Sequence, residues 1–105
     1  MSELGKKEEV GVRLLTLRDC DYCSWLKSEL DENGITYVNI DADEYDDFST
    51  SMEEKFKTDV YPIVFLDLGS TVITIVGETE LETSNTLRTF TTIPHLVSII
   101  KQYIK

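Results

Sequence analysis

The stretch Arg18-Asp19-Cys20-Asp21-Tyr22-Cys23-Ser24-Trp25 holds the only two cysteines of the chain, spaced as C-x-x-C. The hydrophobic pattern changes across this stretch. On its N-terminal side, residues 10–17 are rich in Val and Leu without clean alternation, which is typical of a strand buried on both faces. On its C-terminal side, Cys23, Leu26 and Leu30 recur at helical spacing. The stretch therefore predicts a strand that ends before the first thiol and a helix that begins there.

Length and composition predict a single small domain. The chain has 105 residues and a hydrophobic content of 41%, which fits one folded domain with a modest core. We expect this domain to span residues 10–105 and the polar residues 1–9 to form a flexible tail. No apolar segment resembles a signal peptide or a membrane span, so we expect a cytoplasmic protein that does not contact membranes. In a reducing compartment, a lone cysteine pair is more often catalytic or metal-binding than structural.

The charge balance argues against nucleic acid as a partner. Twenty acidic and ten basic side chains give a formal charge of −10, and no patch of Lys and Arg for a phosphate backbone is evident. Such acidity is commonly a solubility feature. The alternative is that it steers the protein toward a basic partner surface.

The middle of the chain predicts a second strand and a second helix. Asn33-Gly34-Ile35 is typical of a helix end with Gly34 in the left-handed conformation. Residues 36–41 alternate and contain β-formers, so a strand parallel to the first is expected there. Phe48, Met52 and Phe56 lie at i, i+4 and i+8, which predicts that they form the inner face of a helix.

The C-terminal part predicts a hairpin and a last helix. Residues 63–66 and 71–76 read as two antiparallel strands joined by a turn. Residues 77–88 fit either an extension of the last strand or a loop. Thr91-Thr92-Ile93-Pro94 has the hydroxyl cap and early proline of a helix start. The resulting order β-α-β-α-β-β-α predicts an α/β domain with a mixed four-stranded sheet flanked by three helices.

This order resembles the thioredoxin-like fold and, within it, the glutaredoxins. The resemblance covers residues 10–104 and depends on four segments. Cys20-Asp21-Tyr22-Cys23 is similar to the family's Cys-Pro-Tyr-Cys, and residues 59–65 are similar to its Thr-Val-Pro-x-Ile-Phe segment, whose proline is cis. The strand within residues 35–43 and the helix start at residues 90–93 match the family less specifically.

The cysteine pair predicts a division of labour. Only a thiolate attacks a disulfide, and a helix N-terminus helps to stabilise one. We therefore expect Cys20 to be the exposed nucleophile and Cys23, one turn later on the buried stripe, to be the resolving thiol. A cis bond before Pro62 would turn the Tyr61 backbone toward the thiols. The residues expected to bind glutathione or substrate are Arg18, Tyr22, Tyr61, Pro62, Thr91 and Thr92.

The sequence departs from the family pattern near the thiols. Asp21 replaces the usual proline, Leu17 replaces a position that is often basic, and Arg88-Thr89 replaces a Gly-Gly pair. Because Asp19 and Asp21 flank the thiol, we expect Cys20 to be activated less than in a relative with proline at position 21. His95, the only histidine, is expected to be exposed.

The resemblance implies a monomeric thiol–disulfide oxidoreductase. Electrons would come from glutathione or a thioredoxin reductase, and the substrates would be glutathione mixed disulfides or protein disulfides, with ribonucleotide reductase among the possible protein partners. We expect no metal and no tightly bound cofactor, with glutathione as a co-substrate. The alternatives are a carrier of an iron–sulfur cluster bound through Cys20 and glutathione, and a redox-inactive thioredoxin-like adaptor.

Overall fold

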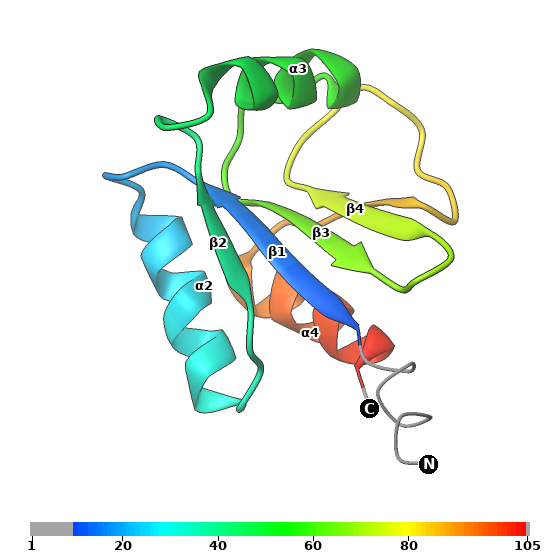
Figure 1. The fold of residues 1–105 in the computed structure, drawn as a ribbon. Coiled ribbons are helices and arrows are strands. Elements are labelled where there is room, and N and C mark those ends of the chain that lie inside the picture. Colours follow the sequence, from blue (N-terminus) through cyan, green and yellow to red (C-terminus); the bar gives the residue numbers. More distant parts are fainter. Residues whose placement is uncertain (1–9, 105) are drawn as a thin grey trace.

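The structure is a computed structural model that describes residues 10–104 (Figure 1). The elements follow the order β1 (Gly11–Thr16), α2 (Asp21–Glu32), β2 (Val38–Asp41), α3 (Asp46–Phe56), β3 (Ile63–Asp67), β4 (Val72–Val76), β5 (Leu87–Thr89) and α4 (Ile93–Tyr103). The predicted α/β, thioredoxin-like architecture is confirmed. The predicted tail, residues 1–9, lies outside the described residues. No described helix is long and apolar enough to cross a membrane.

The strands form one mixed sheet in the order β2-β1-β3-β4-β5. As predicted, β1 runs parallel to β2, and β3 and β4 are antiparallel. Leu15 pairs with Ile40 on one side and with Ile63 on the other, so β1 is an interior strand of the sheet. This register brings the C-terminal end of β1 next to the N-terminal end of β3. The loop that carries the cysteines and the loop that carries Pro62 therefore emerge at the same end of the sheet.

Successive side chains of a strand point to opposite faces of the sheet. Both faces carry buried apolar side chains and are covered by helices. Leu14 belongs to a core cluster with residues of α2 and α4, whereas its neighbour Leu15 belongs to a second cluster against which α3 packs. Figure 1 accordingly shows α3 set apart from α2 and α4. The buried stripe predicted for the first helix is confirmed, since Cys23, Leu26 and Leu30 are at most 1% exposed.

Two predicted helix ends are confirmed. At the end of α2, Gly34 has φ 69°, and the Ile35 N–H donates to the Leu30 carbonyl at 2.9 Å. Glycine adopts this left-handed conformation without the steric cost that a Cβ adds. At the start of α4, the Thr92 hydroxyl accepts from the His95 N–H at 3.2 Å, which is the usual bond of an N-cap.

Two sequence-based expectations need correction. The sheet has five strands rather than four, because residues 87–89, at the end of the unassigned stretch and just beyond it, form β5, which pairs in parallel with β4. The inner face of α3 also differs from the prediction. Phe48 is 39% exposed and Ser49 is the buried residue of this helix, while Met52 and Phe56 are partly buried against the core. The spacing correctly indicates a helix, but Phe48 lies at the margin of the buried face of α3, where its ring contacts Phe65.

Candidate functional site

The two cysteines lie at the N-terminus of α2 and form a disulfide with a Cα–Cα distance of 5.2 Å. Cys20 is the N-cap residue, and its sulfur accepts a hydrogen bond from the Cys23 N–H at 3.1 Å. Cys20 is partly exposed, whereas Cys23 is 1% exposed. The predicted contrast in accessibility is therefore present, and the helix start directs a backbone donor at the outer sulfur, where negative charge would develop on reduction.

The loop before β3 forms the second wall of the site. The Tyr61–Pro62 peptide bond is cis, as the resemblance implied. The Tyr61 carbonyl oxygen lies 4.0 Å from the Cys20 sulfur. Pro62 is buried beneath this loop. The Tyr61 carbonyl therefore lies beside the disulfide.

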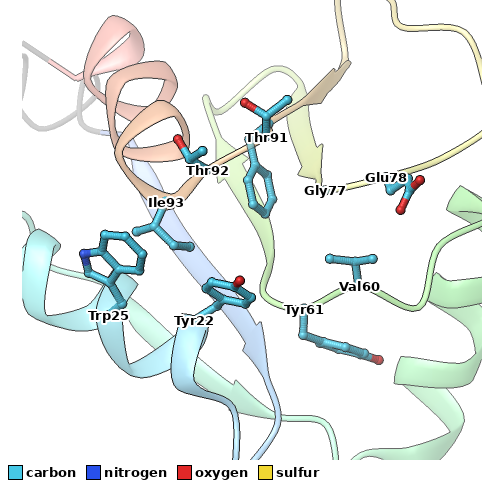
Figure 2. A pocket seen from close by; sticks show the side chains of 10 residues that line it. Tyr22, Trp25, Val60, Tyr61, Gly77, Glu78, Thr91, Thr92 and Ile93 are labelled. Atoms are coloured by element: carbon cyan, nitrogen blue, oxygen red, sulfur yellow. The ribbon is translucent and has the colours of Figure 1, made fainter.

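A cavity of about 500 Å³ opens beside these loops (Figure 2). It is lined by Tyr22, Trp25, Val60, Tyr61, Gly77, Glu78, Phe90, Thr91, Thr92 and Ile93. Four of the predicted site residues, namely Tyr22, Tyr61, Thr91 and Thr92, are thus brought together. Figure 2 shows that they come from the start of α2, the loop before β3 and the start of α4. The Tyr61 ring runs toward α3, so this residue presents mainly its backbone to the cavity.

At the α4 end of the cavity, the predicted donors have partners within the protein. The Thr91 N–H donates to His95 Nδ1 at 3.1 Å, and the Thr92 hydroxyl caps the helix through the His95 N–H. His95 is exposed, as expected, but its ring occupies the donor that was predicted to bind glutathione. A ligand carboxylate would have to displace this ring to reach the Thr91 N–H.

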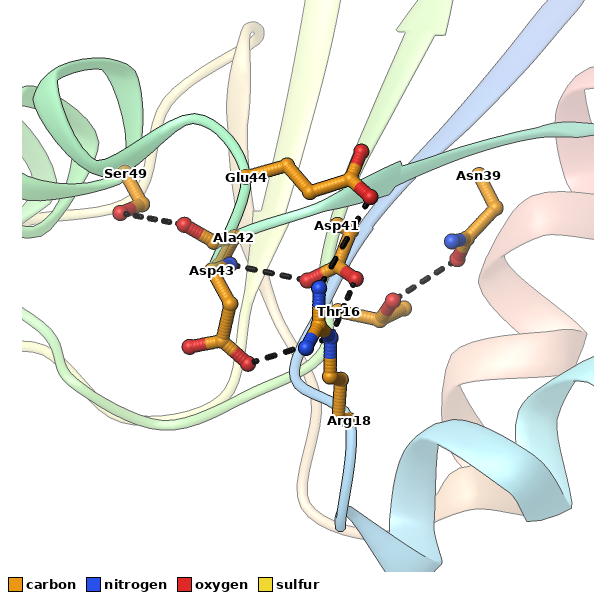
Figure 3. A network of polar contacts seen from close by, with 8 residues as sticks. All are labelled: Thr16, Arg18, Asn39, Asp41, Ala42, Asp43, Glu44 and Ser49. Carbon is orange, nitrogen blue, oxygen red and sulfur yellow. Dashed lines mark hydrogen bonds and ion pairs between the residues drawn. The ribbon is translucent and has the colours of Figure 1, made fainter.

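Arg18 is not among the residues that line the cavity. Its Nε donates to Asp41 at 3.0 Å, and its guanidinium lies 4.0 Å from Asp43 and 3.7 Å from Glu44 (Figure 3). The hydrogen bond from Arg18, followed by that from the Asp43 N–H, lowers the pKa of Asp41 below its ordinary value. Arg18 therefore ties the loop before Cys20 to the loop after β2.

The Tyr61 side chain also connects the loop before β3 to α3. Its hydroxyl donates to Glu53 of α3 at 2.6 Å, and the side chain is buried. Burial, and then the hydrogen bond to Glu53, raises the pKa of Tyr61 well above its ordinary value. The neutral phenol is thus favoured in the folded state.

A pH-dependent contribution to stability follows from this hydrogen bond. It is fully present below the ordinary tyrosine pKa of about 10 and is lost as pH rises from there toward the higher folded-state pKa. We expect Tyr61→Phe to lower the free energy of unfolding by about 1–3 kcal/mol at neutral pH. We also expect it to reduce the loss of stability above pH of about 10. Urea unfolding of both proteins across this range measures the effect. Parallel pH profiles would contradict it.

Several cavity residues were not identified from the sequence. Val60, Gly77, Glu78 and Phe90 reach the cavity because β4 ends beside the loop that precedes Pro62. Of these residues, Gly77 has the clearest structural reason for its residue type. A Cβ at this position would lie 2.7 Å from Cγ1 of Val60 and 3.4 Å from the Phe90 ring. The chain passes closer to its neighbours here than a side chain allows.

Gly77→Ala should therefore disturb the cavity without altering the cysteines. We expect a several-fold rise in KM for a disulfide substrate, because Val60 must move to accommodate the methyl group. Gly11→Ala is the matched control, as its Cβ would make only an ordinary contact with Asp67, at 3.5 Å. Steady-state kinetics of both variants test this. Equal KM values for the two variants would contradict the assignment.

The described residues provide no ready-made metal site. Within residues 10–104, no three or more His, Cys, Asp and Glu side chains are grouped so that they could hold a metal ion.

Comparison with known proteins gives a family and a fold. A family model described as Glutaredoxin matches residues 12–68, more than half of the chain. The solution structure of a glutaredoxin from Brucella melitensis is similar with a TM-score of 0.57 and 20% identity, covering 90% of this chain and 83% of that one. A malarial protein of solved structure is similar with a TM-score of 0.52 and 17% identity, covering 92% and 99%. No curated protein matches the sequence.

Proposed function

The chain belongs to the glutaredoxin family, and we propose that it is a thiol–disulfide oxidoreductase that reduces disulfides through Cys20 and Cys23. The observation that carries this proposal is the disulfide-bonded pair at the N-terminus of α2, in which Cys20 is partly exposed and Cys23 is buried. A pair placed in this way can alternate between dithiol and disulfide.

The reaction would run in two exchange steps. The Cys20 thiolate attacks the substrate disulfide, so a mixed disulfide forms and the first substrate thiolate leaves. The Cys23 thiolate then attacks the Cys20 sulfur, the Cys20–Cys23 disulfide forms, and the second substrate thiolate leaves. Two electrons pass from the cysteine pair to the substrate, whose two thiolates take up protons. Two glutathione thiols, or the dithiol of a thioredoxin reductase, would return the pair to the reduced state.

The proposed substrates are protein disulfides and glutathione mixed disulfides. For a glutathionyl group, we propose contacts with Tyr22, the Tyr61–Pro62 backbone and the start of α4 at Thr91 and Thr92. Arg18 does not line the cavity, and its Nε is hydrogen-bonded to Asp41, so we propose no contact between Arg18 and the glutathionyl group. We further propose that the protein acts as a cytoplasmic monomer, with ribonucleotide reductase among the protein substrates to be tested.

The acidity of Cys20 is open to a direct test. Asp21 is exposed in the first turn of α2, where its carboxylate opposes a neighbouring thiolate. We expect Asp21→Pro to lower the pKa of the Cys20 thiol in the reduced protein, because proline is compatible with the first helical position and removes the charge. Titration of thiolate absorbance in the ultraviolet measures this. Asp21→Asn serves as the control that removes the charge alone, and an unchanged Cys20 pKa in both variants would refute the expectation.

The proposal as a whole is tested by turnover. The purified protein is supplied with a protein disulfide or a small glutathione mixed disulfide, and electrons come from glutathione or from a thioredoxin reductase. We expect at least one combination to support catalysis that depends on Cys20. If the thiols are fully reactive but no combination supports turnover, the adaptor alternative is favoured. The visible spectrum of protein purified without oxygen tests the cluster alternative, since a bound cluster absorbs there.

A further inference from the structure

The cavity beside the thiols has a mainly apolar lining with one acidic side chain. Of the described residues that line it, only Glu78 is charged. The adjoining hollow around Val60 contains Lys57 but also three carboxylates, those of Asp59, Glu78 and Glu80. Asp19 and Asp21 flank Cys20 in the chain and are exposed. Carboxylates therefore lie both in the wall of the cavity and next to Cys20 in the chain.

The nearest arginine does not offset this charge. Arg18 is only two residues from Cys20, but three carboxylates hold it at the loop after β2 (Figure 3). Its hydrogen bond to Asp41 at 3.0 Å raises the pKa of the guanidinium further. The charge of Arg18 is thus largely neutralised within the protein, on the side away from the residues that line the cavity.

The anion-binding potential of the α4 N-terminus is also reduced. A free helix start offers N–H groups to a carboxylate. Here the Thr91 N–H is bound to His95 Nδ1, and the His95 N–H is bound to the Thr92 hydroxyl. An anionic ligand at this end finds two of the donors already satisfied.

The remaining wall suits a cation. Tyr22 and Trp25 lie 6.4 Å apart between ring centroids and are 60% and 43% exposed, so their faces are accessible at the mouth of the cavity (Figure 2). The Trp25 indole N–H donates to Glu29 at 3.3 Å, which places another carboxylate beside the ring. Aromatic faces attract the ammonium of Lys and the guanidinium of Arg.

From this arrangement we propose that the site prefers disulfides within basic peptide segments, and that Glu78 and the exposed Tyr22 and Trp25 rings are the groups of the cavity wall that attract Lys and Arg side chains next to the substrate cysteine. The proposal rests on the proposed oxidoreductase function and narrows its substrate class. Glutathione, whose net charge is negative, would be the poorer ligand of this cavity. The overall charge of −10 acts in the same direction by steering basic partners to the protein.

Single-turnover kinetics with pre-reduced protein test the proposal without any added reductant. Two disulfide-linked peptides are compared that differ only in carrying Lys or Glu on either side of the cysteine, and reduced peptide is measured by chromatography. We expect the Lys peptide to react about tenfold faster at low salt. This ratio should shrink toward one at molar salt, where the Debye length falls to about 3 Å.

Charge-reversal variants separate the cavity from the general field. Glu78→Lys should reduce the ratio of the Lys-peptide rate to the Glu-peptide rate several-fold. Glu82→Lys makes the same change of net charge at an exposed residue outside the cavity and should reduce this ratio much less. Equal rates for the two peptides, a faster Glu peptide, or equal effects of the two variants would overturn the proposal. If the wild-type protein reduces neither peptide although both of its thiols titrate, the oxidoreductase function itself fails.

Discussion

Cys20→Ser is expected to reduce disulfide reduction to the uncatalysed background for every substrate. A serine hydroxyl does not attack a disulfide, and Cys23 cannot replace Cys20 because its side chain is 1% exposed at the inner side of the pair. The loss should be the same for a small glutathione mixed disulfide and for a protein disulfide. Initial rates with excess reductant measure it.

The matched control for this variant is Ser24→Ala. Ser24 is an exposed residue of α2, one position beyond Cys23, and its side chain belongs to neither the disulfide nor the cavity lining. We expect wild-type rates for this control and similar thermal unfolding for both variants. Substantial turnover by Cys20→Ser would assign the attacking thiol to Cys23 and would reverse the proposed roles.

Cys23→Ser is expected to separate the two substrate classes. The variant keeps the attacking thiol but cannot complete the second exchange, so a protein substrate stays linked to Cys20. Protein disulfide reduction should fall close to background. Reduction of a small glutathione mixed disulfide should persist, because a second glutathione can release the first from Cys20.

The measurement is the ratio of the two activities, compared with wild type. Cys23→Ala accompanies Cys23→Ser, since a buried hydroxyl can perturb the core where an alanine side chain does not. If both variants lose both activities equally while remaining folded, Cys23 is needed for more than resolution. If both retain protein disulfide reduction at the wild-type rate, Cys23 is not the resolving thiol.

Most of the fold was predictable from local patterns. The buried spacing of Cys23, Leu26 and Leu30, the end of α2 at Gly34 and the cap of α4 at Thr92 each depend on neighbours within a few residues. β5 was missed because its three residues become a strand only through pairing with β4, and no pattern of their own signals it. Phe48 was wrongly expected on the buried face of α3. The spacing of Phe48, Met52 and Phe56 defines a helix face, but it does not show how far the sheet extends beneath that face.

The site was predictable in its chemistry and less so in its surroundings. The cysteine pair and the loop at Pro62 follow from motifs, and both lie where they were expected. The cavity residues Gly77 and Glu78 could not be inferred, because the order of the strands brings them to the cavity. The partner of Arg18 was also missed, since a hydrogen bond from an exposed side chain to a distant segment has no sequence signature. The bond that His95 Nδ1 accepts from the Thr91 N–H was missed although it is local.

The central claim, that Cys20 attacks and Cys23 resolves, is tested most directly by locating the mixed disulfide. Reduced Cys20→Ser and Cys23→Ser are each mixed with the same disulfide-linked peptide, and the products are digested and mapped by mass spectrometry. We expect rapid formation of a peptide adduct on Cys20 in Cys23→Ser and almost none on Cys23 in Cys20→Ser. An adduct that forms on Cys23 as fast as on Cys20 would contradict it.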